Sequence, residues 1–459
     1  MPKLLFAGAD EFVTGSRHLL EIGNQKLLID CGLFQGEPEK AEIFNRQFLF
    51  KPKEIGAVIL THGHLDHAGG LPLLIERGFA GEIWSTDATR DIAEAILLDA
   101  AVVQKENYEH LLKNFPNQKH SPPVFDKSDV PKVMRRFKVV DYRKRFSPVL
   151  GVTAELFDAG HIIGSSVARI NAGKETLVFS GDLGREHTPT LRDPENVGEA
   201  QTLVLEATYG GHLHRGFDFA RKRIKQLLHE VVETKGKIIA PSFALGRTQV
   251  ILAIIAELYD SNQAPKIPII VDSPLADRMT LIYEKYKKYY DSETKEEMRL
   301  SGHSPFAFPE LRLVSSREES KALNNLSGPL MIISSSGMAE SGRVKHHLAR
   351  NIHDPSNIVL ITGFMARGTL GRYLVEGEPK VRIFGKWFSQ NAQVEDLRGL
   401  SAHAGQDFLV EYAARISGLR RIFLVHGEEA PLKMLKEGLK KTLPRVKIEI
   451  PKLGETASW

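Results

Sequence analysis

The residues best suited to chemistry lie in one short polar segment. Three imidazoles and one carboxylate occur there within six residues, at His62, His64, Asp66 and His67. His62 and His64 are two residues apart, so both rings project from the same side of an extended loop. Neutral imidazoles and a carboxylate form a set of ligands that zinc prefers. A solvated loop would not need four such side chains directly after a buried strand, and the segment therefore predicts a metal site.

Residues of the same types follow predicted strands elsewhere in the chain. A histidine or carboxylate stands at or near the end of an apolar run, or in a loop, at Asp30, His161, Asp182, Glu206, His403 and His426. Glycines beside His161 and Asp182 let the backbone approach a site closely. Any one of these residues alone would be an ordinary turn residue. Together they predict a common rim on which the side chains converge.

The first part of the chain is rich in short apolar runs that are typical of strands. The predicted strands cover residues 3–8, 18–22, 26–30, 56–60, 81–85, 152–157, 167–171, 176–179 and 202–205. A long helix is predicted over 88–112, and the proline-containing stretch 116–131 is predicted to be a loop. The strands are expected to position the candidate ligands, because these residues come at strand ends.

Near residue 207 the pattern changes to alternating helices and strands. Residues 217–234 carry apolar side chains at a helical period. Predicted strands and helices then alternate at 237–240, 248–259, 267–271, 275–290, 330–333, 343–351 and 358–361. This alternation favours a parallel sheet covered by helices. After about residue 389 a final strand, helix, strand and helix are predicted, with His426 directly after the strand 419–425.

The composition is that of an ordinary globular protein with room for two or more domains. The chain has 459 residues, of which 42% are hydrophobic and 26% charged. No run of eighteen apolar residues occurs, and the apolar part of the N-terminus is too short for a secretory signal, so neither a membrane span nor export is expected. Cys31 is the only cysteine, which fits a reducing cytoplasm. The formal charge of +4 is compatible with a polyanionic partner but does not by itself indicate one.

The ordered set of motifs resembles a known family over nearly the whole chain. Asp30 is followed by His62-x-His64-x-Asp66-His67, then by His161, Asp182, Glu206 in Glu206-Ala-Thr-Tyr-Gly, His403 and His426. In this order they are similar to the motifs of metallo-β-lactamase-fold hydrolases of the β-CASP nuclease family. That family includes the endonuclease of the cleavage and polyadenylation factor and its shorter bacterial and archaeal relatives. The chain looks like the short type, because no KH domain precedes Met1, and little sequence preference is therefore expected.

The resemblance implies a fold and a division into domains. The fold would be α/β, with a metallo-β-lactamase αββα sandwich and an inserted parallel-sheet β-CASP domain. The sandwich would be split between residues 1–207 and 390–459, with the β-CASP domain at 208–389. The active site would lie in a cleft between the two, where single-stranded RNA is held mainly through its backbone. Relatives also suggest a homodimer.

The resemblance further implies two Zn²⁺ per chain and a role for each motif residue. One ion would be held by His62, His64 and His161, the other by Asp66, His67 and His426, and Asp182 would bridge them. Asp30 would orient ligands rather than bind metal. The ions would activate a water molecule that attacks phosphorus, leaving 5′-phosphate and 3′-hydroxyl ends. The catalytic residues would be Asp66, Glu206 and His403, with His403 protonating the departing 3′ oxygen and Glu206 orienting it.

The second half of the chain adds candidates for phosphate binding. Ser335, Ser336 and Gly337 follow a predicted strand, and backbone N–H groups with hydroxyls can bind an anion there. Arg247, Arg367 and Thr369 lie in segments that resemble further family loops; for the two arginines a structural role is the alternative. The segment 285–290 interleaves lysines and tyrosines, which is consistent either with strand binding or with ordinary helix packing.

Three other functions compete with an RNA nuclease of this kind. A DNA nuclease of the same family is disfavoured by His426, because the DNA-processing members typically carry valine there. A small-molecule hydrolase on the same catalytic domain is disfavoured by the inserted domain and by the Glu206–His403 pair. A scaffold subunit that has lost its ligands is disfavoured because every ligand position is filled. Whether cleavage is endonucleolytic or 5′-exonucleolytic stays open.

Overall fold

The computed structural model describes residues 2–10, 12–36, 38–214, 216–363, 365 and 368–458. The chain forms two compact units. The first unit consists of Met1–Glu186, Asp193–Leu213 and His403–Trp459, and the second of His187–Arg192 and His214–Ala402. Each unit has its own sheets and its own hydrophobic core.

The first unit is built on two sheets. The seven-stranded sheet has the order β21-β1-β2-β3-β4-β5-β6, with β1 at Lys3–Phe6, β2 at His18–Ile22, β3 at Gln25–Ile29, β4 at Ala57–Ile59, β5 at Glu82–Ser85, β6 at Phe137–Val139 and β21 at Thr456–Ser458. The six-stranded sheet has the order β20-β19-β10-β9-β8-β7, with β7 at Val152–Asp158, β8 at Ser166–Ala172, β9 at Glu175–Phe179, β10 at Thr202–Glu206, β19 at Arg421–Val425 and β20 at Lys447–Glu449.

The alternation of side chains along the strands explains how the layers stack. In β3, Leu27 and Ile29 belong to one core cluster together with Val204 of β10, whereas Leu28 belongs to another. Successive residues of a strand point to opposite faces of the sheet, so the first cluster fills the space between the two sheets. Leu203 and Leu205 of β10 point away from it, into a third cluster. The unit is therefore a four-layer αββα sandwich, and the predicted fold class is confirmed.

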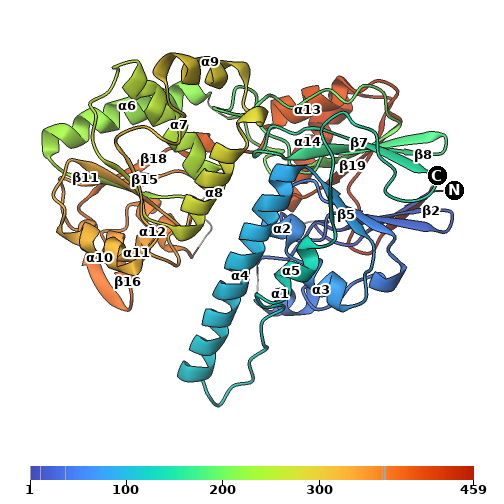
Figure 1. The fold of residues 1–459 in the computed structure, drawn as a ribbon, viewed down its shortest axis with the longest axis horizontal. Helices are drawn as coiled ribbons and strands as arrows, with labels where there is room; N and C mark the ends of the chain where they lie inside the picture. The colour runs from blue at the N-terminus through green and yellow to red at the C-terminus, as the bar shows by residue number, and fades with distance from the viewer. Residues whose placement is uncertain are drawn as a thin grey trace. The chain divides into compact units, whose positions relative to one another are not determined.

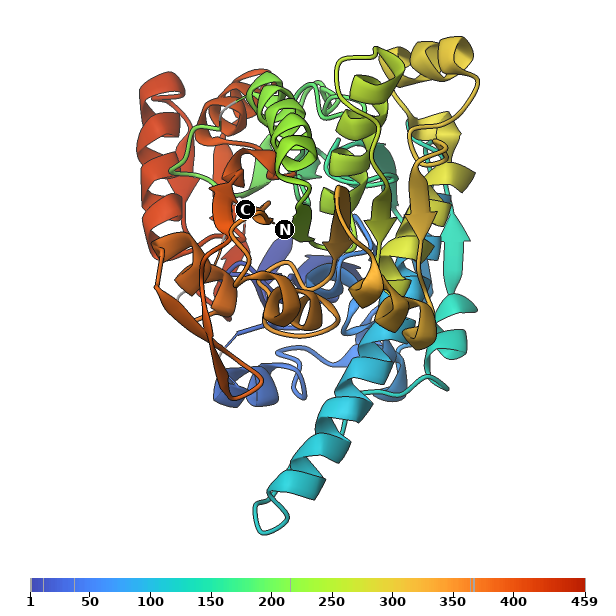
Figure 2. The ribbon, with the colours of Figure 1, turned by 90° about the vertical axis from the view of Figure 1, so that its left-hand side faces the viewer.

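Helices cover the two outer faces of the sandwich. The seven-stranded sheet is covered by α3 (Leu71–Glu76), α4 (Asp87–Asn114) and α5 (Val130–Met134), and the six-stranded sheet by α13 (Gln406–Ala414) and α14 (Glu429–Thr442). Two short helices, α1 (Pro38–Phe44) and α2 (Leu65–Ala68), complete this unit. Thr86 caps α4 by accepting a hydrogen bond from the Thr89 amide. The second half of α4 extends beyond the rest of the unit (Figures 1 and 2).

The second unit contains the parallel sheet that the alternating pattern predicted. Its order is β13-β12-β14-β11-β15-β18, with all neighbours parallel. The strands are β11 at Lys237–Pro241, β12 at Ile269–Val271, β13 at Leu311–Leu313, β14 at Leu330–Ser334, β15 at Ile358–Ile361 and β18 at Gln393–Asp396. The helices are α6 at Phe217–Thr234, α7 at Arg247–Asp260, α8 at Pro274–Lys285, α9 at Ser292–Ser301, α10 at Arg317–Ala322, α11 at Val344–Asn351 and α12 at Leu370–Glu376. A separate hairpin joins β16 (Lys380–Ile383) to β17 (Lys386–Ser389).

Two features of the second unit differ from the sequence prediction. β18 pairs with β15, so the strand expected to open the final segment of the sandwich belongs to the second sheet, and the first unit resumes only at His403. The helix predicted over 275–290 ends at Lys285, and Tyr286, Tyr289 and Tyr290 are buried. These tyrosines therefore serve packing, which was one of the two alternatives for the segment 285–290.

Candidate metal centre

The segment 61–70 lies at the end of β4 and is held from behind by the loop that follows β3. His62 and His64 precede α2, and Asp66 and His67 form its first turn. The Cys31 amide donates to the His67 carbonyl, and the Ser16 amide donates to the Asp66 carbonyl. A Cβ atom at Gly32 would lie only 1.6 Å from the Asp66 carbonyl oxygen. The close passage of these two loops thus requires glycine at position 32 and holds the four candidate ligands in place.

Parallel pairing brings the distant candidates to the same edge. β9, β10 and β19 are parallel neighbours in the six-stranded sheet. Asp182 follows the first of these strands, Glu206 ends the second and His426 follows the third. Their carboxyl ends meet at one edge, so the three side chains meet there too. Gly181, with a φ of +54°, turns the chain between β9 and Asp182.

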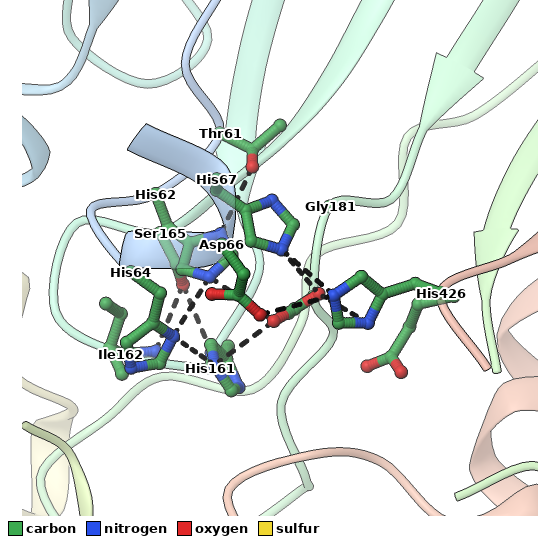
Figure 3. A network of polar contacts seen from close by, with 12 residues as sticks. Thr61, His62, His64, Asp66, His67, His161, Ile162, Ser165, Gly181 and His426 are labelled. Atoms are coloured by element: carbon green, nitrogen blue, oxygen red, sulfur yellow. Dashed lines mark hydrogen bonds and ion pairs between the residues drawn. The ribbon is translucent and has the colours of Figure 1, made fainter. Parts of the chain in front are cut away.

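A first group of ligand atoms surrounds a single point. His62, His64, His161 and Asp182 each offer one atom, and these atoms all lie within 4.8 Å of one another. His62 Nε2 is 3.0 Å from His64 Nδ1 and 3.3 Å from Asp182 Oδ2. His161 Nε2 lies 3.3 Å from His64 Nδ1. The rings point toward one another in Figure 3.

A second group lies directly beside the first. Asp66, His67 and His426 again offer atoms within 4.8 Å of one another. His67 Nε2 is 3.3 Å from His426 Nε2, and His426 Nε2 is 3.5 Å from Asp66 Oδ2 (Figure 3). Asp182 reaches this group with its other oxygen, which lies 3.3 Å from His67 Nε2. Asp182 therefore has one carboxylate oxygen beside each group.

The chemistry of these two groups fits bound cations. Among the described residues, the buried Asp182 Oδ1 has no hydrogen-bond partner. Leaving such an oxygen unsatisfied is costly unless something else binds it. Imidazole nitrogens and carboxylate oxygens are zinc ligands, whereas several imidazoles turned toward each other at these distances have little reason to pack without a shared ion.

Polar groups behind the two clusters fix the orientation of the rings. Asp30 Oδ2 lies 2.7 Å from His67 Nδ1, and Asp30 also accepts hydrogen bonds from the amide and the hydroxyl of Thr61. The Thr61 hydroxyl lies 3.1 Å from His62 Nδ1, and the Thr208 hydroxyl lies 3.1 Å from His426 Nδ1. Each contact leaves the opposite ring nitrogen free to face the cluster. The positions of Thr61 and Thr208 beside motif residues are the signal that could have identified them from the sequence.

The protonation states follow from burial and from neighbouring charges. Burial lowers the pKa of His64 to about 3, and it lowers the pKa of His62 and of His161 as well. These imidazoles are thus neutral near pH 7, which is the form that binds metal. Burial opposes ionisation of Asp182, but the adjacent histidines outweigh it and hold the pKa of that carboxyl well below its usual range.

Glu206 and His403 form a third group that also includes Asp182. Glu206 is fully buried, and it accepts hydrogen bonds from the amides of Leu183 and Thr208. His403 Nδ1 lies 3.1 Å from Glu206 Oε1. Burial would lower the pKa of His403, but the Glu206 carboxylate outweighs it and raises that pKa. The pair is arranged to hold a proton on an imidazole at the border of the ligand cluster.

The predicted phosphate-binding residues that the structure describes lie in the second unit, where Arg247, Ser335 and Thr369 have partners of their own. The Arg247 guanidinium is buried and donates to the Thr362 carbonyl, and the Thr369 hydroxyl caps α12. The Ser335 hydroxyl lies 2.7 Å from that of Ser273. Ser336 is half-buried, and a Cβ at Gly337 would lie 2.6 Å from the Phe243 ring. Arg367 lies outside the described residues. A role in phosphate binding stays a prediction for this set.

Comparison with known proteins identifies the family. Three family descriptions match in succession: the Metallo-beta-lactamase superfamily over residues 13–242, the Beta-Casp domain over 248–374 and the Zn-dependent metallo-hydrolase RNA specificity domain over 389–451. A chain of similar shape, described as a protein of unknown function from Enterococcus faecalis V583, aligns over 99% of both chains with a TM-score of 0.57 and 12% identity, and it supports the fold alone.

Named relatives cover most of this chain. Ribonuclease TTHA0252 of Thermus thermophilus is 35% identical over 98% of each chain. Transcription termination factor FttA of Methanosarcina mazei is 28% identical over 92% of this chain and 66% of its own length. Endoribonuclease YSH1 of Kluyveromyces lactis is 26% identical over 94% of this chain and 56% of its own length. The chain therefore belongs to the metallo-beta-lactamase superfamily, and within it to the beta-CASP family of hydrolases that its motif order predicted.

Proposed function

We propose that this chain is a zinc-dependent ribonuclease that hydrolyses phosphodiester bonds of single-stranded RNA and leaves 5′-phosphate and 3′-hydroxyl ends. The observation that carries the proposal is the meeting of three side-chain groups at Asp182, two of them rich in metal ligands and one holding the Glu206–His403 pair. Support for RNA comes from the match to an RNA specificity domain and from relatives named ribonuclease and endoribonuclease.

The ligand groups suit two metal ions. His62, His64 and His161 would hold one ion, and Asp66, His67 and His426 the other, with an oxygen of Asp182 available to each. Bound there, zinc would lower the pKa of a water molecule and neutralise charge on the phosphate. Asp30 would keep the His67 ring in its binding orientation through the 2.7 Å contact to Nδ1.

His403 and Glu206 would handle the leaving group. The Glu206 carboxylate engages Nδ1 of His403, which leaves Nε2 to donate a proton. When the oxygen of water bonds to phosphorus, the bond from phosphorus to the 3′ oxygen breaks, and the Nε2 proton passes to that oxygen. The attacking water gives up one proton to solvent and the imidazole takes one up from solvent, so the products are a 5′-phosphate and a 3′-hydroxyl. Hydrogen bonds from the Leu183 and Thr208 amides keep Glu206 in position.

The test is product mapping on matched substrates. Purified zinc-loaded protein is incubated with single-stranded RNA and with DNA of the same sequence, each labelled at either end. We expect RNA to be cut faster and to leave 5′-phosphate ends. Faster cleavage of DNA would favour the DNA nuclease, and 2′,3′-cyclic phosphate ends would contradict the use of water as the nucleophile.

Three finer points stay predictions. The fragment lengths in the same experiment separate endonucleolytic from 5′-exonucleolytic cleavage. Light scattering tests the expected homodimer, and localisation in cells tests the expected cytoplasmic site. Among the described residues, no helix combines the length and the apolar character needed to cross a membrane.

A further inference from the structure

The hairpin of β16 and β17 exposes aromatic rings to an unusual degree. Trp387 is 68% exposed and Phe384 is 53% exposed, more than any other aromatic side chain among the described residues. The two residues lie within four positions of each other, at the turn of one short hairpin. A single exposed apolar side chain needs no explanation, but two neighbouring aromatics of this size indicate a surface with a function.

The register of the hairpin separates a buried face from an exposed one. Val381 and Ile383 are 2% and 0% exposed and belong to the core of the second unit. Arg382 pairs with Trp387 across the two strands, so these side chains share the opposite face. Lys380 is two residues from Arg382 along the strand and lies on that same face, on the order of 7 Å away. Cations and an aromatic ring thus alternate on the exposed face.

A second aromatic position lies at the turn, next to α11. The Phe384 ring packs on the His346 ring with 4.5 Å between centroids, and the Lys345 ammonium lies 5.3 Å from the centre of the Phe384 ring. Figure 1 shows β16 in the same region of the second unit as α11. Packing on His346 steadies the exposed Phe384 ring, and Lys345 adds a positive charge beside it.

The charges of this surface are uncompensated. Residues 379–390 contain Lys380, Arg382 and Lys386 but no aspartate or glutamate. Each of these three cations is exposed, and among the described residues none has an ion pair with a carboxylate. Elsewhere in the unit, the half-buried Arg372 pairs with Glu376. The hairpin is therefore complementary to a polyanion.

We propose that the exposed face of the β16–β17 hairpin, formed by Lys380, Arg382, Phe384 and Trp387 with the exposed Lys386 beside it at the turn, is a second binding surface for single-stranded RNA, separate from the metal centre. A base stacks on Trp387, and the cations bind the adjoining phosphates. Every base has an aromatic face, so such stacking is tolerant of sequence. Protein interfaces are depleted in lysine, whereas this surface contains two lysines in ten residues, which favours a nucleic acid over a protein partner. This inference rests on the proposed action on RNA.

The test compares binding of a fluorescein-labelled oligouridine 20-mer by fluorescence anisotropy. All variants carry His403→Ala in addition, so that the strand stays intact while it is measured. Trp387→Ala should weaken binding on the order of tenfold, and Trp387→Phe should retain most of it because a ring remains. Arg382→Ala should lower the slope of log affinity against log salt by about 0.7, the value for one phosphate contact on a single strand.

Two control substitutions remove side chains of similar character that lie outside the hairpin. Leu281→Ala removes an apolar side chain that is 58% exposed on α8, and Arg445→Ala removes an exposed arginine of the first unit. Both should leave affinity unchanged. The proposal is overturned if Trp387→Ala binds like Leu281→Ala, or if it changes the oligomeric state and not the affinity, which would make the hairpin a protein contact. Cleavage by the otherwise unchanged chain tests the proposed function separately, so that failure of one proposal is distinguishable from failure of the other.

Discussion

At the scale of single residues, Asp182 lies between the two clusters of candidate ligands and contacts both of them. One of its oxygens is 3.3 Å from His62 Nε2 and the other is 3.3 Å from His67 Nε2. Asp182→Ala should therefore reduce the occupancy of both metal positions, whereas His426→Ala should reduce chiefly one. Metal content by mass spectrometry after dialysis against zinc measures both.

The matched control for this prediction is Asp407→Ala, which removes an exposed aspartate of α13 in the same unit. It should retain the metal content of the unaltered chain. The bridging role of Asp182 is contradicted if Asp182→Ala retains one metal at full occupancy, or if the unaltered chain is fully active without a transition metal.

Four of the candidate ligands could be predicted from the sequence because they stand close together in the chain. His62, His64, Asp66 and His67 stand within six residues, and their types alone indicate a metal. The hydroxyls of Thr61 and Thr208 were not predicted, because threonine is common and their contacts with Asp30 and His426 form only in the folded chain. The exposure of Trp387 was not predicted either, because it depends on which face of the hairpin packs on the core.

At the scale of secondary structure elements, Asp272 joins the end of β12 to α10 and α11. Its buried carboxylate lies 2.6 Å from His347 Nε2 and accepts hydrogen bonds from Ser320 and Arg343. Burial opposes ionisation of Asp272, but the bonds from His347, Ser320 and Arg343 outweigh it and lower the pKa. Because the folded pKa lies below the unfolded value of about 3.9, the stabilisation is present above that pH and is lost as the pH falls through the folded pKa.

Asp272→Asn should thus lower the free energy of unfolding by about 3 kcal/mol at pH 7, since it leaves the Arg343 guanidinium without the opposite charge of its carboxylate partner. Ser320→Ala, which removes one hydrogen bond to the same carboxylate, should cost about 1 kcal/mol. Urea unfolding at pH 7 and below pH 4 measures both. The gap between Asp272→Asn and the unaltered chain should narrow at the lower pH, and an equal gap at both pH values would contradict this account.

The long amphipathic helices could be predicted from the sequence, but the pairing of strands that are distant in the chain could not. The helical period of residues 217–234 predicted the bounds of α6, because its buried apolar residues form one stripe along the helix. The strand near residue 393 was recognisable as a strand, but its partner β15 lies more than thirty residues earlier in the chain. No local pattern records that pairing, so the place of β18 in the second sheet could not be predicted from the sequence.

At the scale of the whole molecule, the two units have separate cores, and among the described residues the clusters of candidate ligands all lie in the first unit. Calorimetry should therefore show two unfolding transitions, of which only one responds to zinc. Zinc at 1,000 times its Kd should stabilise that unit by about 4 kcal/mol, a shift of about 10 °C. Removal of the metal by a chelator should reverse the shift and leave the other transition in place. Equal shifts of both transitions would contradict the assignment of the metal to the first unit.

The most direct test of the central claim is the rate of cleavage by His403→Ala on two RNA substrates, one with the ordinary scissile 3′ oxygen and one with sulfur in its place. A sulfur leaving group departs without needing a proton. If His403 donates that proton and binds no metal, His403→Ala should keep its zinc and lose about 10²–10⁴-fold in rate on the oxygen substrate. On the sulfur substrate the deficit should largely vanish. An undiminished deficit on sulfur, or loss of zinc from the variant, would show that His403 is a ligand or a structural residue instead.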